Sequence, residues 1–243
     1  MTETLLEVRN LTKTFGGLVA LRDVTFSIRR GGVIGIIGPN GSGKSTLINV
    51  ITGIGRATMG EVEFCGRSIV GLRPSAIFRL GLNRTFQSTR VFAGMSVRRN
   101  LQIVAWTQRL PSSDVDHQLE QFGLASVAEL NAENLSYGDR KMLELGMSLI
   151  GRPKLVLLDE PLAGVHESVV LRVSTLLREI KTTTFVVVEH NVPFVTATCE
   201  QIFVLNQGQL IANGTPAEIR SNPAVIAAYL GSGADSHRVL ERA

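Results

Sequence analysis

The segment best suited to chemistry is a glycine-rich loop near the N-terminus. It fits the pattern G-x-x-x-x-G-K-[ST], which average residue usage would produce by chance in about one chain per hundred of this length. Glycines let consecutive backbone N–H groups turn inward around phosphate oxygens, and the helix that follows adds its positive end. Lys44 should reach the β/γ-phosphates, and the Ser45 hydroxyl should ligate Mg²⁺. The predicted phosphate-binding loop is Gly38-Pro39-Asn40-Gly41-Ser42-Gly43-Lys44-Ser45-Thr46.

Polar residues also follow two later apolar runs, at the places where buried strands should end. Asp159 and Glu160 close one run, and His190 follows the other. Such residues are commonly just exposed strand ends, but open α/β sheets bind ligands at the carboxyl ends of their strands. With a phosphate loop upstream, we expect Asp159 to hold Mg²⁺, directly or through water, and Glu160 to orient or deprotonate the attacking water. His190 should point at the γ-phosphate. The pattern predicts hydrolysis of a nucleoside triphosphate.

The elements that must position these groups are those of an α/β protein. The chain has 243 residues, 44% of them apolar, which is enough for one large α/β domain with a small lobe. Its apolar runs are too short for a membrane span of about 20 residues and suit strands buried on both faces. They are Val33–Ile37, Leu155–Leu158 and Phe185–Val188. We predict a P-loop NTPase core with a mostly parallel sheet.

Two smaller parts should accompany this core. The segments 5–9, 24–28 and 61–64 have the composition of half-exposed strands and predict an antiparallel β subdomain. From about Pro74 to Asn134 the periodicity is helical, and we expect a helical insertion over about residues 74–150. The whole ATPase domain should cover residues 1–231, followed by a polar tail over 232–243.

Charge is unevenly distributed, although the net charge is only +4. No acidic residue lies between Glu63 and Asp114, a stretch with eight arginines. This stretch can be a solvated basic face, or a surface that meets lipid headgroups or an acidic partner loop. No nucleic-acid-binding motif accompanies the arginine-rich stretch, so we expect no nucleic-acid partner. The N-terminus has no apolar signal core, and we expect a cytoplasmic protein.

A further segment, Leu135-Ser136-Tyr137-Gly138-Asp139, resembles the L-S-G-G-Q signature sequence of ABC transporter ATPases. Thr85-Phe86-Gln87 resembles the Q-loop of that family, His190 its switch histidine, and Phe15 the aromatic residue that stacks on adenine. The order and spacing of these motifs match the family from Leu5 to Leu230, which makes the resemblance very specific.

The resemblance implies an ATPase that uses ATP and Mg²⁺ and works as a head-to-tail dimer, homomeric or heteromeric. The segment formed by Ser136, Tyr137 and Gly138 would donate to the γ-phosphate bound by the other copy. Gln87 would touch Mg²⁺ or water at the root of the helical insertion and transmit nucleotide occupancy to transmembrane permease subunits. The chain would sit on the inner face of the cell membrane, and a periplasmic or extracellular substrate-binding protein would be an indirect partner.

The substrate stays open among alternatives. Several segments look like the branch that serves importers of branched-chain amino acids, whose relatives transport urea and short amides. Leu145-Gly146-Met147 resembles the urea type, and lipid exporters use a similar cassette. The segments that resemble the branched-chain branch are 79–87, 163–164, 214–219, 222–223 and 228–231, together with Tyr137.

Two residues depart from the family pattern. Asp139 stands where the signature usually has Gln, and His166 where many relatives carry the D-loop Asp. An anion near the phosphate-binding end of a helix can weaken the ATP-bound dimer or slow turnover. Every residue of the hydrolytic core is nevertheless present, so we predict an active ATPase.

Rival classes lack support in the sequence. A GTPase would need an N-K-x-D motif, and the chain has no Asn-Lys pair. A small-molecule kinase would leave residues 136–139 unexplained. ABC proteins that act on DNA or ribosomes usually carry paired cassettes or long insertions, and a non-hydrolysing cassette would lack Glu160 or His190.

Overall fold

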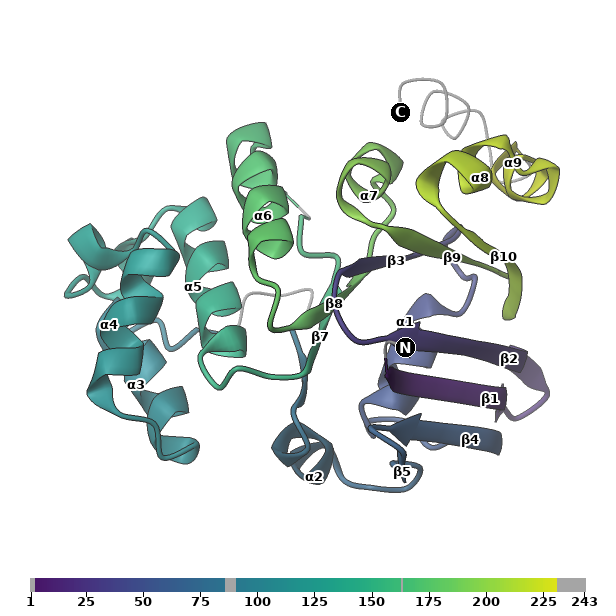
Figure 1. Ribbon diagram of the computed structural model, residues 1–243, viewed down its shortest axis with the longest axis horizontal. Coiled ribbons are helices and arrows are strands. Elements are labelled where there is room, and N and C mark those ends of the chain that lie inside the picture. Colours follow the sequence, from purple (N-terminus) through teal and green to yellow (C-terminus); the bar gives the residue numbers. More distant parts are fainter. Residues whose placement is uncertain (1–2, 86–90, 163, 231–243) are drawn as a thin grey trace.

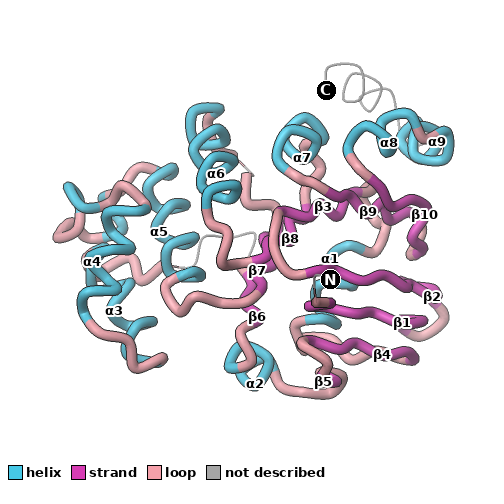
Figure 2. Tube along the Cα trace, in the orientation of Figure 1, coloured by secondary structure: helices cyan, strands magenta, loops and turns pink. Residues whose placement is uncertain are grey.

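The computed structural model describes residues 3–85, 91–162 and 164–230 of the chain. Two sheets and a separate group of helices make up the fold (Figure 1). The helical group α3–α5, within residues 97–149, lies at one end, the small sheet at the other, and the large sheet runs between them (Figure 2). This is the α/β architecture predicted above, with its antiparallel and helical parts.

The large sheet has six strands in the order β10-β9-β3-β8-β7-β6. All neighbours pair in parallel except β10, which is an antiparallel edge strand. The central strands β3, β7 and β8 are buried at every position, as expected of apolar runs covered on both faces. The bounds are β3 Val33–Ile37, β6 Leu82–Arg84, β7 Leu155–Asp159, β8 Thr184–Val188, β9 Gln201–Asn206 and β10 Gln209–Gly214.

The small sheet is antiparallel, in the order β2-β1-β4-β5. Its inner face shares a hydrophobic core with helix α1 and with one face of the large sheet, so α1 is enclosed between the two sheets. Residues from all three meet there, for example Val62, Ile48 and Val188. The bounds are β1 Thr4–Phe15, β2 Leu18–Arg29, α1 Lys44–Ile51, β4 Met59–Phe64 and β5 Arg67–Ser68.

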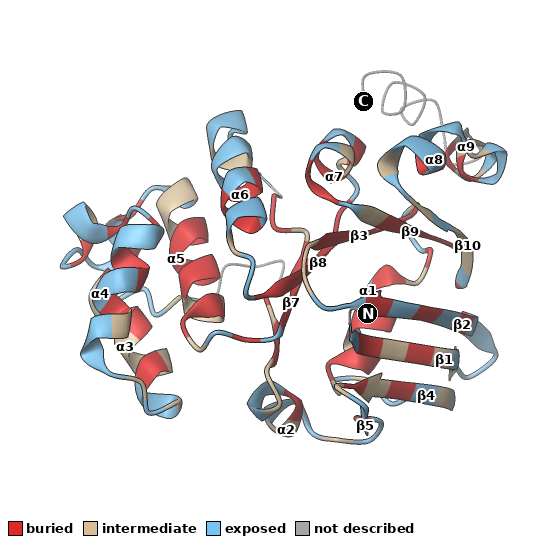
Figure 3. Ribbon diagram, viewed as in Figure 1, coloured by how far each residue is buried: buried red, intermediate tan, exposed pale blue. Residues whose placement is uncertain are grey.

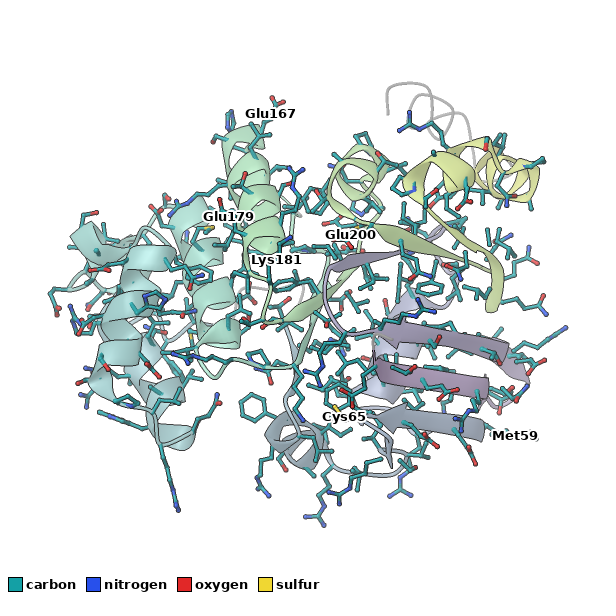
Figure 4. The ribbon with its side chains drawn as sticks, in the orientation of Figure 1. Met59, Cys65, Glu167, Glu179, Lys181 and Glu200 are labelled. Atoms are coloured by element: carbon teal, nitrogen blue, oxygen red, sulfur yellow. The ribbon has the colours of Figure 1, made fainter. Side chains whose placement is uncertain are left out.

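The other face of the large sheet is covered by helices. They share a second hydrophobic core with the helical group, in which Phe122 and Leu143 are fully buried, and the inner helix faces are buried (Figure 3). Helix α6 begins far from the sheet, where Glu167 projects into solvent, and ends near β8 at Glu179 (Figure 4). The bounds are α3 Val97–Thr107, α4 Ser112–Gln121, α5 Tyr137–Leu149, α6 Glu167–Glu179, α7 Val192–Thr198, α8 Pro216–Ser221 and α9 Pro223–Leu230.

One stretch differs from the expectation. The segment from Pro74 onward was predicted to be helical, and after the short helix α2 (Pro74–Arg79) it instead enters the large sheet as β6. This strand pairs with β7, and the carbonyl of Gly81 accepts the backbone N–H groups of Lys154 and Leu155. A three-residue strand is too short to show a period of two, so the surrounding helical pattern concealed it. Among the described residues, no helix combines the length and hydrophobicity required of a membrane span.

Candidate functional site

The predicted phosphate-binding loop connects β3 to α1. Lys44 is the first residue of α1, and its side chain is buried. Its Nζ donates to the carbonyl oxygens of Gly38 at 2.7 Å and Pro39 at 3.0 Å. The ammonium therefore lies folded back over the loop, with the loop's own carbonyls as its partners. Burial lowers the pKa of Lys44 below its ordinary value, and the charges of Glu160 and Asp159 oppose that shift.

Two glycines of this loop are required by close packing. Gly43, the residue before α1, has φ 104°, and a Cβ there would lie 2.7 Å from the carbonyl oxygen of Ala20. A Cβ on Gly38 would collide with the carbonyl oxygen of Leu205. The loop is thus pressed against β9 and the start of β2, which holds its backbone N–H groups in one arrangement.

A cavity of about 490 Å³ opens beside the loop. Phe15 lies in its wall with 56% of its surface exposed, and the Nζ of Lys13 is 4.6 Å from the centre of its ring. An exposed aromatic face next to a phosphate loop is suited to stacking on a purine base. The cavity is lined by Phe15, Leu18, Val19, Ala20, residues 40–46, Glu160, Gln207 and Gly208. The sequence reasoning missed Leu18–Ala20 and Gln207–Gly208. For Leu18–Ala20, the sequence signal that could have indicated a place in the cavity wall is the short turn that follows Phe15.

The strand ends bring the predicted catalytic residues to one edge of the sheet. β7 and β8 pair in register with Asp159 opposite Val188, as expected. Glu160 follows in a left-handed backbone conformation, φ 46°, and its N–H donates to the carbonyl of Val188 at 2.9 Å. Its backbone is therefore turned out of the strand direction, and the residue lines the cavity beside the phosphate-binding loop.

Asp159 has a partner that the sequence did not suggest. The Nη2 of Arg84, on β6, lies 2.8 Å from the Oδ2 of Asp159, and both side chains are about nine-tenths buried. Arg84 also donates to the Oδ1 of Asn49 on α1. The carboxylate of Asp159 and the hydroxyl of Ser45 are hard oxygen donors, which is the ligand chemistry that Mg²⁺ prefers. The two residues thus have the donor chemistry of the predicted magnesium site, which stays a prediction.

His190 lies just beyond β8, next to the strand that carries Asp159, but 63% of its side chain is exposed and it is not among the cavity-lining residues. Gln87, the predicted Q-loop residue, lies outside the described residues, as do Phe86 and Ala163. Their predicted roles stay predictions.

The segment Ser136–Gly138 lies at the start of α5, in the helical group. Ser136 is the N-cap of α5, with its Oγ accepting the backbone N–H of Asp139 at 3.1 Å and donating to the Oδ2 of the same residue at 2.7 Å. The other oxygen of Asp139 is 3.7 Å from a guanidinium nitrogen of Arg172 on α6. Tyr137 is 41% exposed. Among the described residues that line the cavity, none comes from this segment.

Comparison with known proteins agrees with this geometry. Residues 21–163 match the family model described as ABC transporter, and residues 209–235 match that described as Branched-chain amino acid ATP-binding cassette transporter. The chain belongs to the ABC transporter family, as an ATP-binding subunit with ATPase activity. The family and the fold class predicted from the sequence are confirmed.

Individual relatives are similar over almost their whole length. The high-affinity branched-chain amino acid transport ATP-binding protein LivG of Salmonella typhimurium is 37% identical, with 95% of this chain and 99% of LivG covered. BraF of Pseudomonas aeruginosa, which carries the same description, is 34% identical over the same shares. The crystal structure of the ADP conformation of MJ1267, an ATP-binding cassette of an ABC transporter, superposes with a TM-score of 0.86 at 33% identity, covering 95% of this chain and 100% of MJ1267.

The packing around the loop yields a prediction with a matched control. Gly43→Ala should destabilise the nucleotide-free protein by about 1–3 kcal/mol more than Gly41→Ala. Both glycines have positive φ, but a Cβ on Gly41 meets nothing within 4 Å whereas one on Gly43 meets Ala20 and Leu21. Urea unfolding of the two variants measures the difference. Equal losses would mean that the contact with β2 does not constrain the loop.

Proposed function

We propose that this chain binds Mg-ATP in the cavity beside residues 38–46 and hydrolyses it within a head-to-tail dimer, driving import through membrane permease subunits. The cargo is a branched-chain amino acid, and the chain acts in the cytoplasm, on the inner face of the membrane. The single observation that carries the dimer is the separation of two half-sites: the cavity contains the phosphate loop and Glu160, while the exposed Ser136 segment lies on another part of the chain.

Each half-site has the chemistry that the other lacks. The cavity supplies Lys44 and the loop amides on one side of the phosphates. The start of α5 supplies the Ser136 hydroxyl, the Gly138 amide and the positive end of a 13-residue helix. A second copy facing the first would bring these donors to the γ-phosphate, so that ATP is held between two subunits.

The residues at the sheet edge would have different roles in ATP hydrolysis. Ser45 and Asp159 would hold Mg²⁺, with Gln87 as a further contact, and the ion neutralises charge on the phosphate oxygens. Lys44 has to leave the carbonyls of Gly38 and Pro39 to pair with phosphate. Glu160 orients and deprotonates the attacking water, and His190 donates to the γ-phosphate.

A groove that includes Thr52, at the opposite end of α1 from the cavity, is our candidate docking surface for a permease. Two adjoining cavities of about 350 and 320 Å³ share Phe78, Asn83 and Arg84. Phe78 and Phe92 are exposed apolar residues in their walls, and the lining is mostly apolar. A cytoplasmic segment of a permease with an apolar residue would fill such a groove.

Two arginines of the acid-free stretch have acidic partners within the fold, and a third lies against an aromatic ring. Arg84 is paired with Asp159 inside the fold, and Arg98 is paired with Asp116 and Glu129. Arg99 lies 4.7 Å from the ring centre of Trp106. We therefore take the groove, rather than Arg84, Arg98 and Arg99, as our candidate for the permease contact.

The cargo is assigned from the relatives. LivG and BraF are described as branched-chain amino acid transport proteins, and residues 209–235 match a model with the same cargo in its description. Urea or short amides, and export of lipids, are the alternatives that the sequence raised. Stimulation of ATP hydrolysis by each cargo class in the reconstituted transporter would discriminate them.

The dimer is tested with a variant that binds ATP without hydrolysing it. Glu160→Gln should dimerise on addition of Mg-ATP, and adding Ser136→Ala should weaken that dimer at least about tenfold through loss of a hydrogen bond to phosphate. Analytical ultracentrifugation measures the dimer. Ser126→Ala, an exposed serine elsewhere in the helical group, is the control, and Lys44→Ala should abolish Mg-ATP binding. The proposal is contradicted if dimerisation does not depend on ATP, or if Ser136→Ala leaves the ATP-bound dimer as stable as before.

Asp139 generates a second prediction, in which stability and activity change in opposite directions. Asp139→Asn removes an anion that would lie near the bound γ-phosphate, so ATP-dependent dimerisation and turnover should rise about two- to tenfold. The same change weakens the interaction with Arg172 and with the start of α5, which should lower the free energy of unfolding by up to about 1 kcal/mol. Glu120→Gln, which removes an exposed charge from α4, is the control. Unchanged or slower turnover would show that the negative charge of Asp139 does not slow ATP hydrolysis.

The groove generates a third prediction. Phe78→Glu should reduce association with permease-containing membranes at least about tenfold, because a charge cannot enter an apolar contact without a partner. Met59→Glu is the control, since Met59 is also exposed and apolar but lies at the outer end of β4 in the small sheet (Figure 4). Sedimentation with native membranes measures association. Equal behaviour of the two variants would place the contact elsewhere.

A further inference from the structure

Glu189 is a buried carboxylate to which none of the steps above gives a role. It follows β8 directly, and only 1% of its side chain is exposed. Burial raises its pKa, and hydrogen bonds from backbone N–H groups together with the nearby His190 oppose that rise. A buried carboxylate is costly unless its oxygens are satisfied, so its partners indicate what it does for the fold.

The two carboxylate oxygens bond to two different loops. Oε1 accepts the backbone N–H of Leu162 at 3.0 Å. Oε2 accepts the backbone N–H groups of His190 at 3.2 Å and Asn191 at 3.4 Å. Leu162 lies two residues after Glu160, so one side chain fastens the loop that carries Glu160 to the loop that carries His190.

The loop held at Oε1 needs such a restraint. Glu160 has a left-handed backbone conformation that residues other than glycine adopt only when their surroundings hold them. On its N-terminal side, Glu160 is fixed by the hydrogen bond from its own N–H to the carbonyl of Val188. On its C-terminal side, the backbone N–H of Leu162, two residues further on, donates to Glu189. The backbone of Glu160 is thus anchored on both sides to the end of β8.

We propose that Glu189 is a positioning residue for ATP hydrolysis, whose carboxylate sets the placement of Glu160 relative to His190 through the backbone of their loops. The inference rests on the roles proposed above for these two residues. The Nδ1 of His190 also lies 3.8 Å from the Oε2 of Glu189, but the proposed role acts through the backbones of the two loops.

A carboxylate is the group suited to this bridge. Ionised, it offers acceptors on both oxygens and no donor, so it can serve N–H groups from both loops at once. A glutamine of the same size offers one oxygen and one NH₂ group, and the NH₂ group would face backbone N–H donors on one of the two loops. Glu189→Gln should therefore remove the hydrogen bonds from one of the two loops to the side chain at position 189, while the glutamine occupies the same volume.

The test separates binding from chemistry. Glu189→Gln should lower kcat about 10- to 100-fold while KM and the Kd for Mg-ATP stay within about twofold, because the phosphate loop is untouched and only the hydrolytic groups shift. Glu189→Asp, which keeps the charge but reaches less far, should fold and lose about tenfold in kcat. Glu200→Gln, the same change at an exposed glutamate after α7, should leave kcat unchanged (Figure 4).

A double-mutant cycle shows whether the effect runs through Glu160. If Glu189 acts by placing Glu160, adding Glu189→Gln to Glu160→Gln should reduce the residual rate far less than the product of the two separate effects. The inference is overturned if either Glu189 variant keeps kcat within twofold, if KM or Kd accounts for the loss, or if the two effects multiply. Failure of the wild-type protein to hydrolyse ATP would instead refute the proposed function.

Discussion

The parallel register of β3, β7 and β8 is the constraint on which the site depends. These strands are buried along their whole length, and their pairing sets Val188 opposite both Ile36 and Asp159. Because backbone hydrogen bonds hold this register and close-packed side chains cover both faces of the strands, the strand ends are fixed in space. The phosphate loop, the Glu160 loop and the His190 loop leave the sheet from these ends, so their relative positions follow from the packing of the core.

Within that frame, backbone groups do much of the positioning. Lys44 is held by two carbonyls of its own loop, Glu160 by the carbonyl of Val188, and the loops after β7 and β8 by the carboxylate of Glu189. Charges of opposite sign accompany one another: Arg84 with Asp159, and Lys44 within the fields of Glu160 and Asp159. This mutual compensation lets several ionised groups share a partly desolvated site, each with a partner that limits its desolvation cost.

The sequence predicted the parts whose signal is local and repeated. The strand at 33–37 has the expected bounds and the strand at 184–188 contains the expected run 185–188, because an apolar run between turns is what a strand buried on both faces requires. β6 was missed because three residues carry no period, and Arg84, Arg98 and Glu189 were missed because their partners are distant in sequence and chosen by the fold. The phosphate loop was predictable because it is contiguous, whereas the cavity wall at Gln207 and Gly208 was not.

Helix α5 connects the two surfaces that the proposed function requires. Its 13 residues span about 20 Å. The first turn carries the Ser136 segment that would meet a second copy, and Glu144, Met147 and Ser148 further along line the groove proposed for the permease. The Nδ2 of Asn83, on β6, donates to the carbonyl of Ser148 at 2.7 Å, which ties the far end of α5 to the large sheet. A helix is stiff over this length, so a permease that displaced the groove end of α5 would also displace its N-terminus. Permease docking and dimer closure over ATP would then both move the same rigid helix. Coupling between the two events would need no chain of intermediate contacts.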